Sequence, residues 1–200
     1  MLRPAQMESN YCFMSRLGWL TATFGRRGRL MGLAFIHQSA SEDTVVTLSH
    51  PSAERCLECL KQQLDGYWKR SCRTFNIPLL LAGNALQQRV WEELLTIRFG
   101  QCLDLPSLAL RVGAPGSLLA VAEAIRDNPI ALLVPSHRVF GWESLATPGS
   151  AKEWLSELRR LEDLVPGENT CLSFGKHVST PEEWARAKAL APSALMVPES

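Results

Sequence analysis

The chain has 200 residues, of which 46% are hydrophobic and 20% charged, and its formal net charge is +1. This length suits one globular domain or two small ones, and so small a charge excludes nucleic-acid binding through overall basicity, leaving only a local basic patch or shape. No apolar run is long enough to span a bilayer and the first ten residues lack a signal-peptide core, which predicts an intracellular protein that makes no membrane contact.

The first third of the chain has the pattern of a small α+β unit. Alternating residues predict a strand over 17–24, a turn over 25–28 and a partner strand over 30–36. Residues 43–49, rich in Val and Thr, are expected to add a third strand. Apolar residues at helical spacing predict a helix over 52–68.

The six cysteines are too few for a secreted disulfide scaffold and indicate reduced thiols. Cys56 and Cys59 form a CxxC pair inside the predicted helix. That spacing also fits one face of a helix, and no second metal-binding pair lies near, which favours a helix face over a metal or redox site. Cys12 and His37 add no four-ligand spacing. We therefore predict no metal and no cofactor.

After Gly83 the chain becomes mainly helical. Amphipathic spacing predicts helices over 85–97, 105–112, 115–126 and 150–164. The second and third of these, separated by a short turn at Gly113, are a candidate helix-turn-helix, although such a pair is more often ordinary helix packing. A capping box from Thr180 to Glu183 predicts a last helix over 180–190.

The most informative segment follows the helix predicted over 115–126. Asn128-Pro129 and a strand-like apolar run lead into Pro135-Ser136-His137-Arg138-Val139. This segment resembles the active site of O6-alkylguanine-DNA alkyltransferases, where Asn-Pro and an apolar run precede Pro-Cys-His-Arg-Val. In that family the cysteine takes the alkyl group from damaged guanine and is not regenerated. Ser136 stands here at the position of that cysteine.

The resemblance extends over roughly residues 17–164. Residues 83–91 resemble Gly-Thr-x-Phe-Gln-x-x-Val-Trp, and residues 97–100 resemble Ile-Pro-x-Gly. It implies an α/β fold, with a small N-terminal α+β domain whose short antiparallel sheet packs on a helical C-terminal domain containing a helix-turn-helix. The predicted domains are residues 1–83, residues 84–165 and a C-terminal extension over 166–200 that carries one helix.

The resemblance also implies where the chemistry lies. In the family the helix-turn-helix enters the minor groove and the damaged base is flipped into a pocket. Ser136 and His137 would form the catalytic pair. The residues expected at DNA are Leu105, Pro115, Gly116, Ser117, Leu119, Ala120, Asn128 and Arg138. The pocket is expected to be lined by Val134, Pro135, Trp142 and Gly149.

Structural roles are the alternative for several of these residues. His137 and Arg138 could bond backbone groups that brace the helix-turn-helix. Asn128 is expected to act as a hinge that bonds backbone amides. Trp142 could fill the pocket or stack on a base. Leu119, like Leu105 and Leu118, could belong to the packing or to a surface for a protein partner.

His137 is expected to lack the carboxylate that orients the corresponding histidine in the family. In the family a glutamate on the later helix orients it, but the register counted from Lys152 places Arg159 at that position. Glu157 and Glu162 are near, and neither falls in register. A base without an orienting carboxylate is a weaker base.

The DNA surface departs from the family pattern as well. Leu119 aligns with the arginine that replaces the flipped base, although an apolar wedge can still unstack bases. Leu105 aligns with the tyrosine that helps rotate the target phosphate, and Asp104 places a negative charge beside it. The loop over 140–149 lacks the Tyr-x-Gly-Gly that forms one wall of the guanine pocket.

These departures favour a natural, degenerate member of the family, since a serine hydroxyl is a far weaker nucleophile than a thiol. The leading hypothesis is a monomeric DNA-repair homologue, cytoplasmic or nuclear, or nucleoid-associated in a bacterium. It would bind double-stranded DNA, or O6-alkylguanine in it, without transferring the alkyl group. One alternative is a pseudoenzyme that serves as a protein-interaction or regulatory module with an unknown protein partner. The other is a serine variant of an active methylated-DNA–protein-cysteine methyltransferase.

Overall fold

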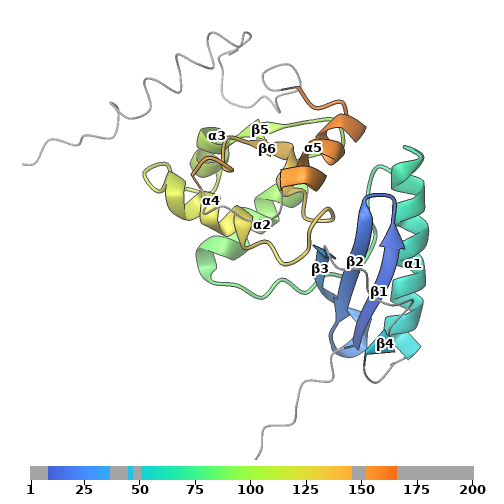
Figure 1. Ribbon diagram of the computed structural model, residues 1–200. Helices are drawn as coiled ribbons and strands as arrows, with labels where there is room; N and C mark the ends of the chain where they lie inside the picture. The colour runs from blue at the N-terminus through green and yellow to red at the C-terminus, as the bar shows by residue number, and fades with distance from the viewer. Residues whose placement is uncertain (1–8, 37–44, 47–50, 146–151, 166–200) are drawn as a thin grey trace, which may run out of the picture.

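A small antiparallel sheet with one helix against it packs beside a helical half in the computed structural model (Figure 1). The structure describes residues 9–36, 45–46, 51–145 and 152–165. This arrangement confirms the predicted fold class. The boundary predicted between residues 83 and 84 coincides with the residue that caps the first helix of the helical half, and the division into domains stays a prediction.

The sheet has the strand order β3-β2-β1-β4. Its strands are β1 (Ser9–Ser15), β2 (Gly18–Phe24), β3 (Leu30–Ile36) and β4 (Val45–Val46). The strands predicted over 17–24 and 30–36 are confirmed, and of the strand predicted over 43–49 the described part is Val45–Val46. Strand β1 was not predicted, because only Tyr11 and Phe13 mark its buried face and Ser9, the third buried residue, is polar.

Helix α1 (Pro51–Trp68) confirms the helix predicted over 52–68. Its buried residues recur every three or four positions: Ala53, Cys56, Leu60, Leu64 and Tyr67. Cys56 belongs to this face while Cys59 is exposed, and both are free thiols. Within the described residues, no group of three or more His, Cys, Asp or Glu side chains could hold a metal ion.

The helical half contains α2 (Ala85–Thr96), α3 (Leu105–Arg111), α4 (Leu118–Arg126) and α5 (Lys152–Leu161). All four predicted helices are present, but α4 begins three residues later than expected, because Pro115–Ser117 complete the turn that follows Gly113. Helices α3 and α4 are the predicted helix-turn-helix pair. The helix predicted over 180–190 lies outside the described residues.

The apolar run after Asn128 is not a strand, contrary to the sequence prediction. Ile130 makes one isolated bridge to Leu33 of β3, and the chain then turns, with Leu132 at a φ of 72°. The Asn128 side chain sets this turn: its Oδ1 accepts from the amide of Ile130 at 3.0 Å and its Nδ2 donates to the carbonyl of Val134 at 2.8 Å. Asn128 thus bonds backbone groups as predicted, and its role as a hinge stays a prediction.

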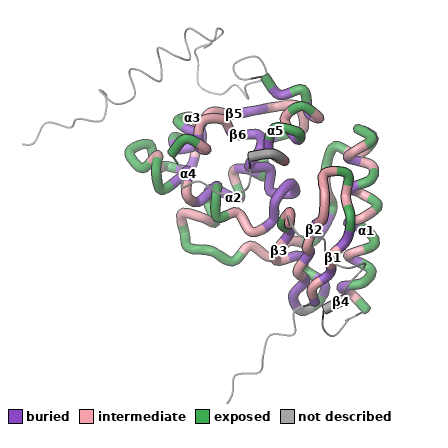
Figure 2. Tube along the Cα trace, in the orientation of Figure 1, coloured by how far each residue is buried: buried purple, intermediate pink, exposed green. Residues whose placement is uncertain are grey.

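A continuous set of buried apolar side chains joins the two halves, as the buried positions between the elements in Figure 2 indicate. Trp91 of α2 donates its indole N–H to the carbonyl of Ala124 in α4 at 2.7 Å. Phe35 of β3 stacks on Trp154 of α5 with ring centres 5.1 Å apart. In the part of the chain that is described, no helix has the length and apolarity needed to cross a membrane.

Replacing the cap of α2 tests how this helix is fixed. The Asn84 side chain accepts from the amides of Leu86 and Gln87, and the Gln87 side chain accepts from the amide of Asn84. We expect Asn84→Ala to lower the free energy of unfolding by about 1 kcal/mol in chemical denaturation. Gln88→Ala, at an exposed position inside α2, is the control; an equal loss in both variants would contradict the capping role.

Candidate functional site

The segment that carries Ser136 is tied to both halves of the molecule. On one side, Leu33 of β3 donates to the carbonyl of Pro129 and accepts from the amide of Ala131, each at 2.8 Å. On the other side, the short strand β6 (Val139–Phe140) pairs in parallel with β5 (Leu103–Asp104). Between these anchors, Ser136–Arg138 form one turn of 3-10 helix, η2. The backbone of the site is therefore fixed at both ends.

Every side chain of this turn is buried. Ser136 is 3% exposed, His137 is 0% exposed and Arg138 is 7% exposed. Burying a histidine and an arginine is costly unless each finds a hydrogen-bonding or charged partner. In this structure they share one partner.

That partner is the carboxylate of Glu162, which follows α5. Its Oε1 accepts from His137 Nε2 at 2.9 Å, from Arg138 Nη2 at 2.8 Å and from the Tyr67 hydroxyl at 2.6 Å. Its Oε2 accepts from Arg138 Nε at 2.8 Å and from the Gly100 amide at 3.2 Å. Arg138 also donates to the carbonyl of Ile97 at 2.6 Å. One carboxylate thus joins α1, the loop after α2 and the Ser136 segment.

The expectation that His137 lacks an orienting carboxylate is therefore wrong. Arg159 and Glu162 are three residues apart, so their side chains project from the same side of the helix and its end. Both therefore reach the segment that carries Ser136. The carboxylate comes from about one helical turn beyond the position given by the register from Lys152. Arg138 differs from its predicted structural role too, since a carboxylate rather than only backbone groups holds it.

Burial and charge set the protonation of this network. Desolvation favours the neutral acid of Glu162, but hydrogen bonds from His137 and Arg138, with the positive charge of Arg138, outweigh it and lower its pKa to about 2. Desolvation lowers the pKa of His137, more than the nearby Glu162 raises it. We therefore take His137 as neutral, with Arg138 supplying the positive charge next to Glu162. Burial, with the carboxylate beside it, raises the pKa of Tyr67, which stays a donor.

A neutral His137 whose Nε2–H donates to Glu162 has its lone pair on Nδ1. This Nδ1 atom is buried and has no hydrogen-bond partner among the described residues. A carboxylate-oriented imidazole with a free lone pair is the arrangement of a general base. His137 can therefore accept a proton at Nδ1, and Ser136 precedes it in the chain.

Arg159, at the position where the register from Lys152 placed the orienting carboxylate, bonds backbone carbonyls instead of the His137 side chain. Its Nε donates to the carbonyl of His137 at 2.8 Å and its Nη2 to the carbonyl of Val139 at 2.6 Å. It also forms an ion pair with Glu143, and its guanidinium lies 4.1 Å from the centre of the Phe140 ring. Arg159 thus holds the loop after the Ser136 segment against it.

Trp142 of this loop is 5% exposed and donates its indole N–H to the carbonyl of Ser136 at 3.3 Å. The ring packs inside the protein, as expected for a residue that fills the pocket, and is not presented to a base. Val134 and Pro135, also predicted to line the pocket, are buried, while Gly149 lies outside the described residues.

The residues predicted to contact DNA fall into two groups. Pro115, Gly116, Ser117, Leu119 and Ala120 are all exposed on the turn before α4 and on its first residues, with Leu119 56% exposed. Leu105 is 2% exposed, and its side chain packs in the core, as does that of Arg138. For both, the burial contradicts a place at DNA and agrees with the structural alternative. Asn128, half-buried, bonds its own turn.

Asp104, the negative charge noted beside Leu105, has a structural role in capping α3. Its side chain accepts from the amide of Ser107 at 2.7 Å and so caps α3. Neither the bond from Tyr67 to Glu162 nor the contacts of Arg159 with the loop were predicted from the sequence. A tyrosine and an arginine far apart in the sequence gave no local signal of these roles.

Comparisons with known proteins place the chain in one family. The family described as "6-O-methylguanine DNA methyltransferase, DNA binding domain" matches residues 85–163. The methylated-DNA–protein-cysteine methyltransferase of Mycobacterium leprae is 48% identical over 79 residues, 40% of this chain and 48% of that protein, so the match spans about half of that relative. The constitutive enzyme of Bacillus subtilis is 34% identical over 123 residues, 60% of this chain and 74% of that protein.

Solved structures extend the similarity to most of the described fold. The crystal structure of Mycobacterium tuberculosis OGT in complex with DNA has a TM-score of 0.62 and 32% identity, covering 76% of this chain and 90% of that one. The crystal structure of Mycobacterium tuberculosis O6-methylguanine methyltransferase has a TM-score of 0.62 and 31% identity, covering 77% and 92%.

Acid should weaken the fold through Glu162. An unfolded glutamate has a pKa of about 4.3, so the stability that this group contributes is present above about pH 5 and is lost as the pH falls toward 2. We expect Glu162→Gln to lower the free energy of unfolding at pH 7 by about 3 kcal/mol, because Arg138 loses its buried counter-ion, and to flatten the acid branch of the stability curve.

Urea denaturation from pH 7 down to pH 3 measures both effects. Glu157→Gln is the matched control, because Glu157 forms an exposed ion pair with Arg160 and should change stability by less than about 0.5 kcal/mol. If Glu162→Gln kept both the stability and the acid slope of the natural chain, the central place of this carboxylate would be refuted.

Proposed function

Because the chain belongs to the 6-O-methylguanine DNA methyltransferase family, we propose that it binds double-stranded DNA and recognises O6-alkylguanine in it without taking up the alkyl group. The observation that carries this proposal is the pairing of an oriented base with a poor nucleophile. His137 is held by Glu162 as a general base would be, and the residue beside it is Ser136. We further propose that the chain acts as a monomer.

The chemistry explains why one side chain decides the outcome. In transfer to a cysteine, the thiolate sulfur forms a bond to the alkyl carbon while the bond from that carbon to guanine O6 breaks. The guanine anion so released then takes up a proton, which restores its normal hydrogen-bonding groups. A thiol with a pKa of about 8.5 supplies some thiolate at neutral pH, and a nearby base supplies more. A serine hydroxyl is a much weaker acid and a poorer nucleophile toward carbon, so Ser136 leaves the alkyl group on the base.

The exposed turn before α4 supports DNA binding. Leu119 projects from the second residue of α4, flanked by the small exposed residues Ser117 and Ala120. Apolar side chains of this kind are inserted between base steps in the minor groove and partly unstack them. The first amides of α4 receive no side-chain cap from Ser117 and point the positive end of the helix outward, where a phosphate can bind.

Entry of a base requires the loop of Trp142 to move. This ring now packs against the Ser136 carbonyl, and the ion pair between Arg159 and Glu143 fastens the loop. A flipped base would have to displace Trp142, at the expense of the hydrogen bond to Ser136. The proposal therefore includes an opening of residues 140–145 on lesion binding.

A second candidate function follows from the network around Glu162. If this chain is a serine variant of an active methyltransferase, the base and its orienting carboxylate would be kept, as they are here. Replacing Ser136 by Cys distinguishes this candidate from the alternative of a protein-interaction module that does not bind DNA.

Ser136→Cys should convert the protein into a single-turnover acceptor. We expect its mass to rise by one methyl group after incubation with a duplex that contains O6-methylguanine, because His137 and Glu162 can assist formation of the thiolate. Intact-protein mass spectrometry provides the measurement, and Ser136→Ala corrects for reaction at the other cysteines. An absence of transfer, with the lesion duplex bound, would show that the site is impaired beyond Ser136.

Leu119 should contribute to DNA affinity without contributing to its salt dependence. In fluorescence anisotropy with a labelled duplex across a salt series, we expect Leu119→Ala to weaken binding by about 3-fold to 10-fold at unchanged slope. Leu119→Arg should steepen the slope by about one unit by adding a phosphate contact. Leu95→Ala, 45% exposed on α2, is the control. Affinities unaffected by either change at Leu119 would remove this turn from the DNA surface.

A further inference from the structure

The carboxylate that orients His137 is also held from the sheet half of the molecule. Tyr67 lies in the last turn of α1, and its hydroxyl donates to Oε1 of Glu162 at 2.6 Å. The same oxygen accepts from Nε2 of His137 at 2.9 Å. One oxygen atom thus links a side chain of the sheet half to the histidine of the helical half.

The ring of Tyr67 is fully buried, and three aromatic rings pack around it. The ring centres of Trp68, Phe75 and Phe99 lie 5.2, 5.3 and 5.7 Å from that of Tyr67. Edge-to-face and tilted contacts of this kind are attractive and hold the ring in a close-packed position. Packing that does not involve the hydroxyl therefore directs it at Glu162, and a phenylalanine would keep the ring while removing only the donor.

The end of α1 also fixes the backbone that carries Glu162. Arg70, three residues after Tyr67, donates from Nε to the carbonyl of Leu161 at 2.8 Å and forms an ion pair with Asp163. Leu161 and Asp163 are the two neighbours of Glu162 in the chain. The sheet half therefore holds Glu162 through its side chain and through the residues on both sides of it.

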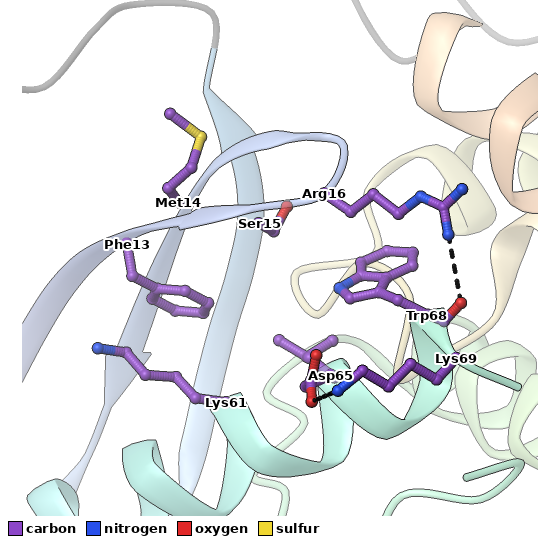
Figure 3. Close-up of a pocket in the computed structure, with 9 residues that line it drawn as sticks. Phe13, Met14, Ser15, Arg16, Lys61, Asp65, Trp68 and Lys69 are labelled. Carbon is purple, nitrogen blue, oxygen red and sulfur yellow. Dashed lines mark hydrogen bonds and ion pairs between the residues drawn. The ribbon is translucent and has the colours of Figure 1, made fainter. Parts of the chain in front are cut away.

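Contacts with the sheet half fix the end of α1 in turn (Figure 3). Arg16, in the turn after β1, donates to the carbonyl of Trp68 at 3.3 Å. One turn before the end of the helix, Leu64 is buried against the sheet half, in the core cluster that includes Phe13 of β1. The sheet therefore sets the position from which Tyr67 reaches Glu162.

Two positive charges lie near His137 and Glu162. Arg138 of η2 gives two hydrogen bonds to the carboxylate, and Arg159 of α5 donates to the carbonyl of His137. Both guanidinium groups favour a neutral imidazole, whereas the carboxylate favours a protonated one. Tyr67 adds an uncharged donor on the side of the carboxylate, and so bears on how strongly Glu162 attracts a proton to His137.

The hydroxyl of Tyr67 limits the basicity of the carboxylate. Each hydrogen bond to a carboxylate stabilises its charged form and lowers its affinity for a further proton. Without this donor, Glu162 would stabilise a protonated imidazole more strongly. A protonated imidazole has a hydrogen on both nitrogens, so His137 would lose its acceptor at Nδ1.

We propose that Tyr67 is a positioning residue of this site: by donating to Oε1 of Glu162, its hydroxyl keeps His137 neutral, with the Nδ1 lone pair ready to accept a proton. The base is then completed by the sheet half, and the helical half that carries His137 is not sufficient for it. The proposal concerns the free protein and does not depend on the proposed binding of a lesion.

Nuclear magnetic resonance of ¹⁵N-labelled histidine rings reports their protonation directly. The chain has four histidines, and a His137→Gln spectrum assigns the signals of His137. In Tyr67→Phe we expect the midpoint of the His137 titration to rise by about one pH unit, because losing a hydrogen bond to a charged group changes a coupled pKa by about that much. Tyr11→Phe, at the other tyrosine of the chain, which is also buried, is the matched control and should leave the midpoint unchanged.

Urea denaturation of both variants at pH 7 separates positioning from a structural role. A loss of stability in Tyr67→Phe with an unchanged His137 titration would assign the hydroxyl to stability alone and overturn the proposal, as would a variant that does not fold. A lowered midpoint, an equal rise in Tyr11→Phe, or a His137 that stays unprotonated in both proteins until they unfold would overturn it too. Failure to bind a lesion duplex would leave the titration result intact.

Discussion

The carboxylate of Glu162 is the interaction on which the rest of the site depends. It is fully buried as a charge, and such a charge is tolerated only when its oxygens are saturated with donors. Tyr67 brings a donor from α1, Gly100 brings one from the loop after α2, and His137 and Arg138 bring the Ser136 segment. The two halves of the molecule therefore meet at the carboxylate that also orients His137. The same hydrogen bonds hold the halves together and fix the geometry of the site.

For the chemistry, the consequence is that the surroundings of Ser136 are those of an oriented base, although Ser136 itself departs from the family pattern. The base has its orienting carboxylate, the segment is anchored on β3 and β5, and Arg159 binds two of its carbonyls. Trp142 is buried and donates its indole N–H to the carbonyl of Ser136. The proposed recognition of a lesion through binding alone depends on this setting. The exposed turn before α4, with an apolar tip at Leu119, suits recognition by shape more than by charge.

Much of this could be predicted from the sequence. Periodicity gave α1 through α5 and two of the strands, and the motif around Ser136 located the site. What failed depended on tertiary contacts. The apolar run from Ile130 became a turn because Asn128 bonds its backbone, and Leu105 is an interior residue. Glu162 was discounted because counting along a helix gives a register but not which side chain reaches a buried partner. Strand β1 alternates too weakly to be detected alone.

The most direct test of the central claim is native mass spectrometry of the unaltered chain. It would be mixed with two duplexes of distinguishable mass, one with a single O6-methylguanine and one unmodified. The account predicts a non-covalent complex mainly with the lesion duplex, and a protein mass that is unchanged after denaturation. Equal complexes with both duplexes would contradict lesion recognition, and a protein heavier by one methyl group would contradict the absence of transfer.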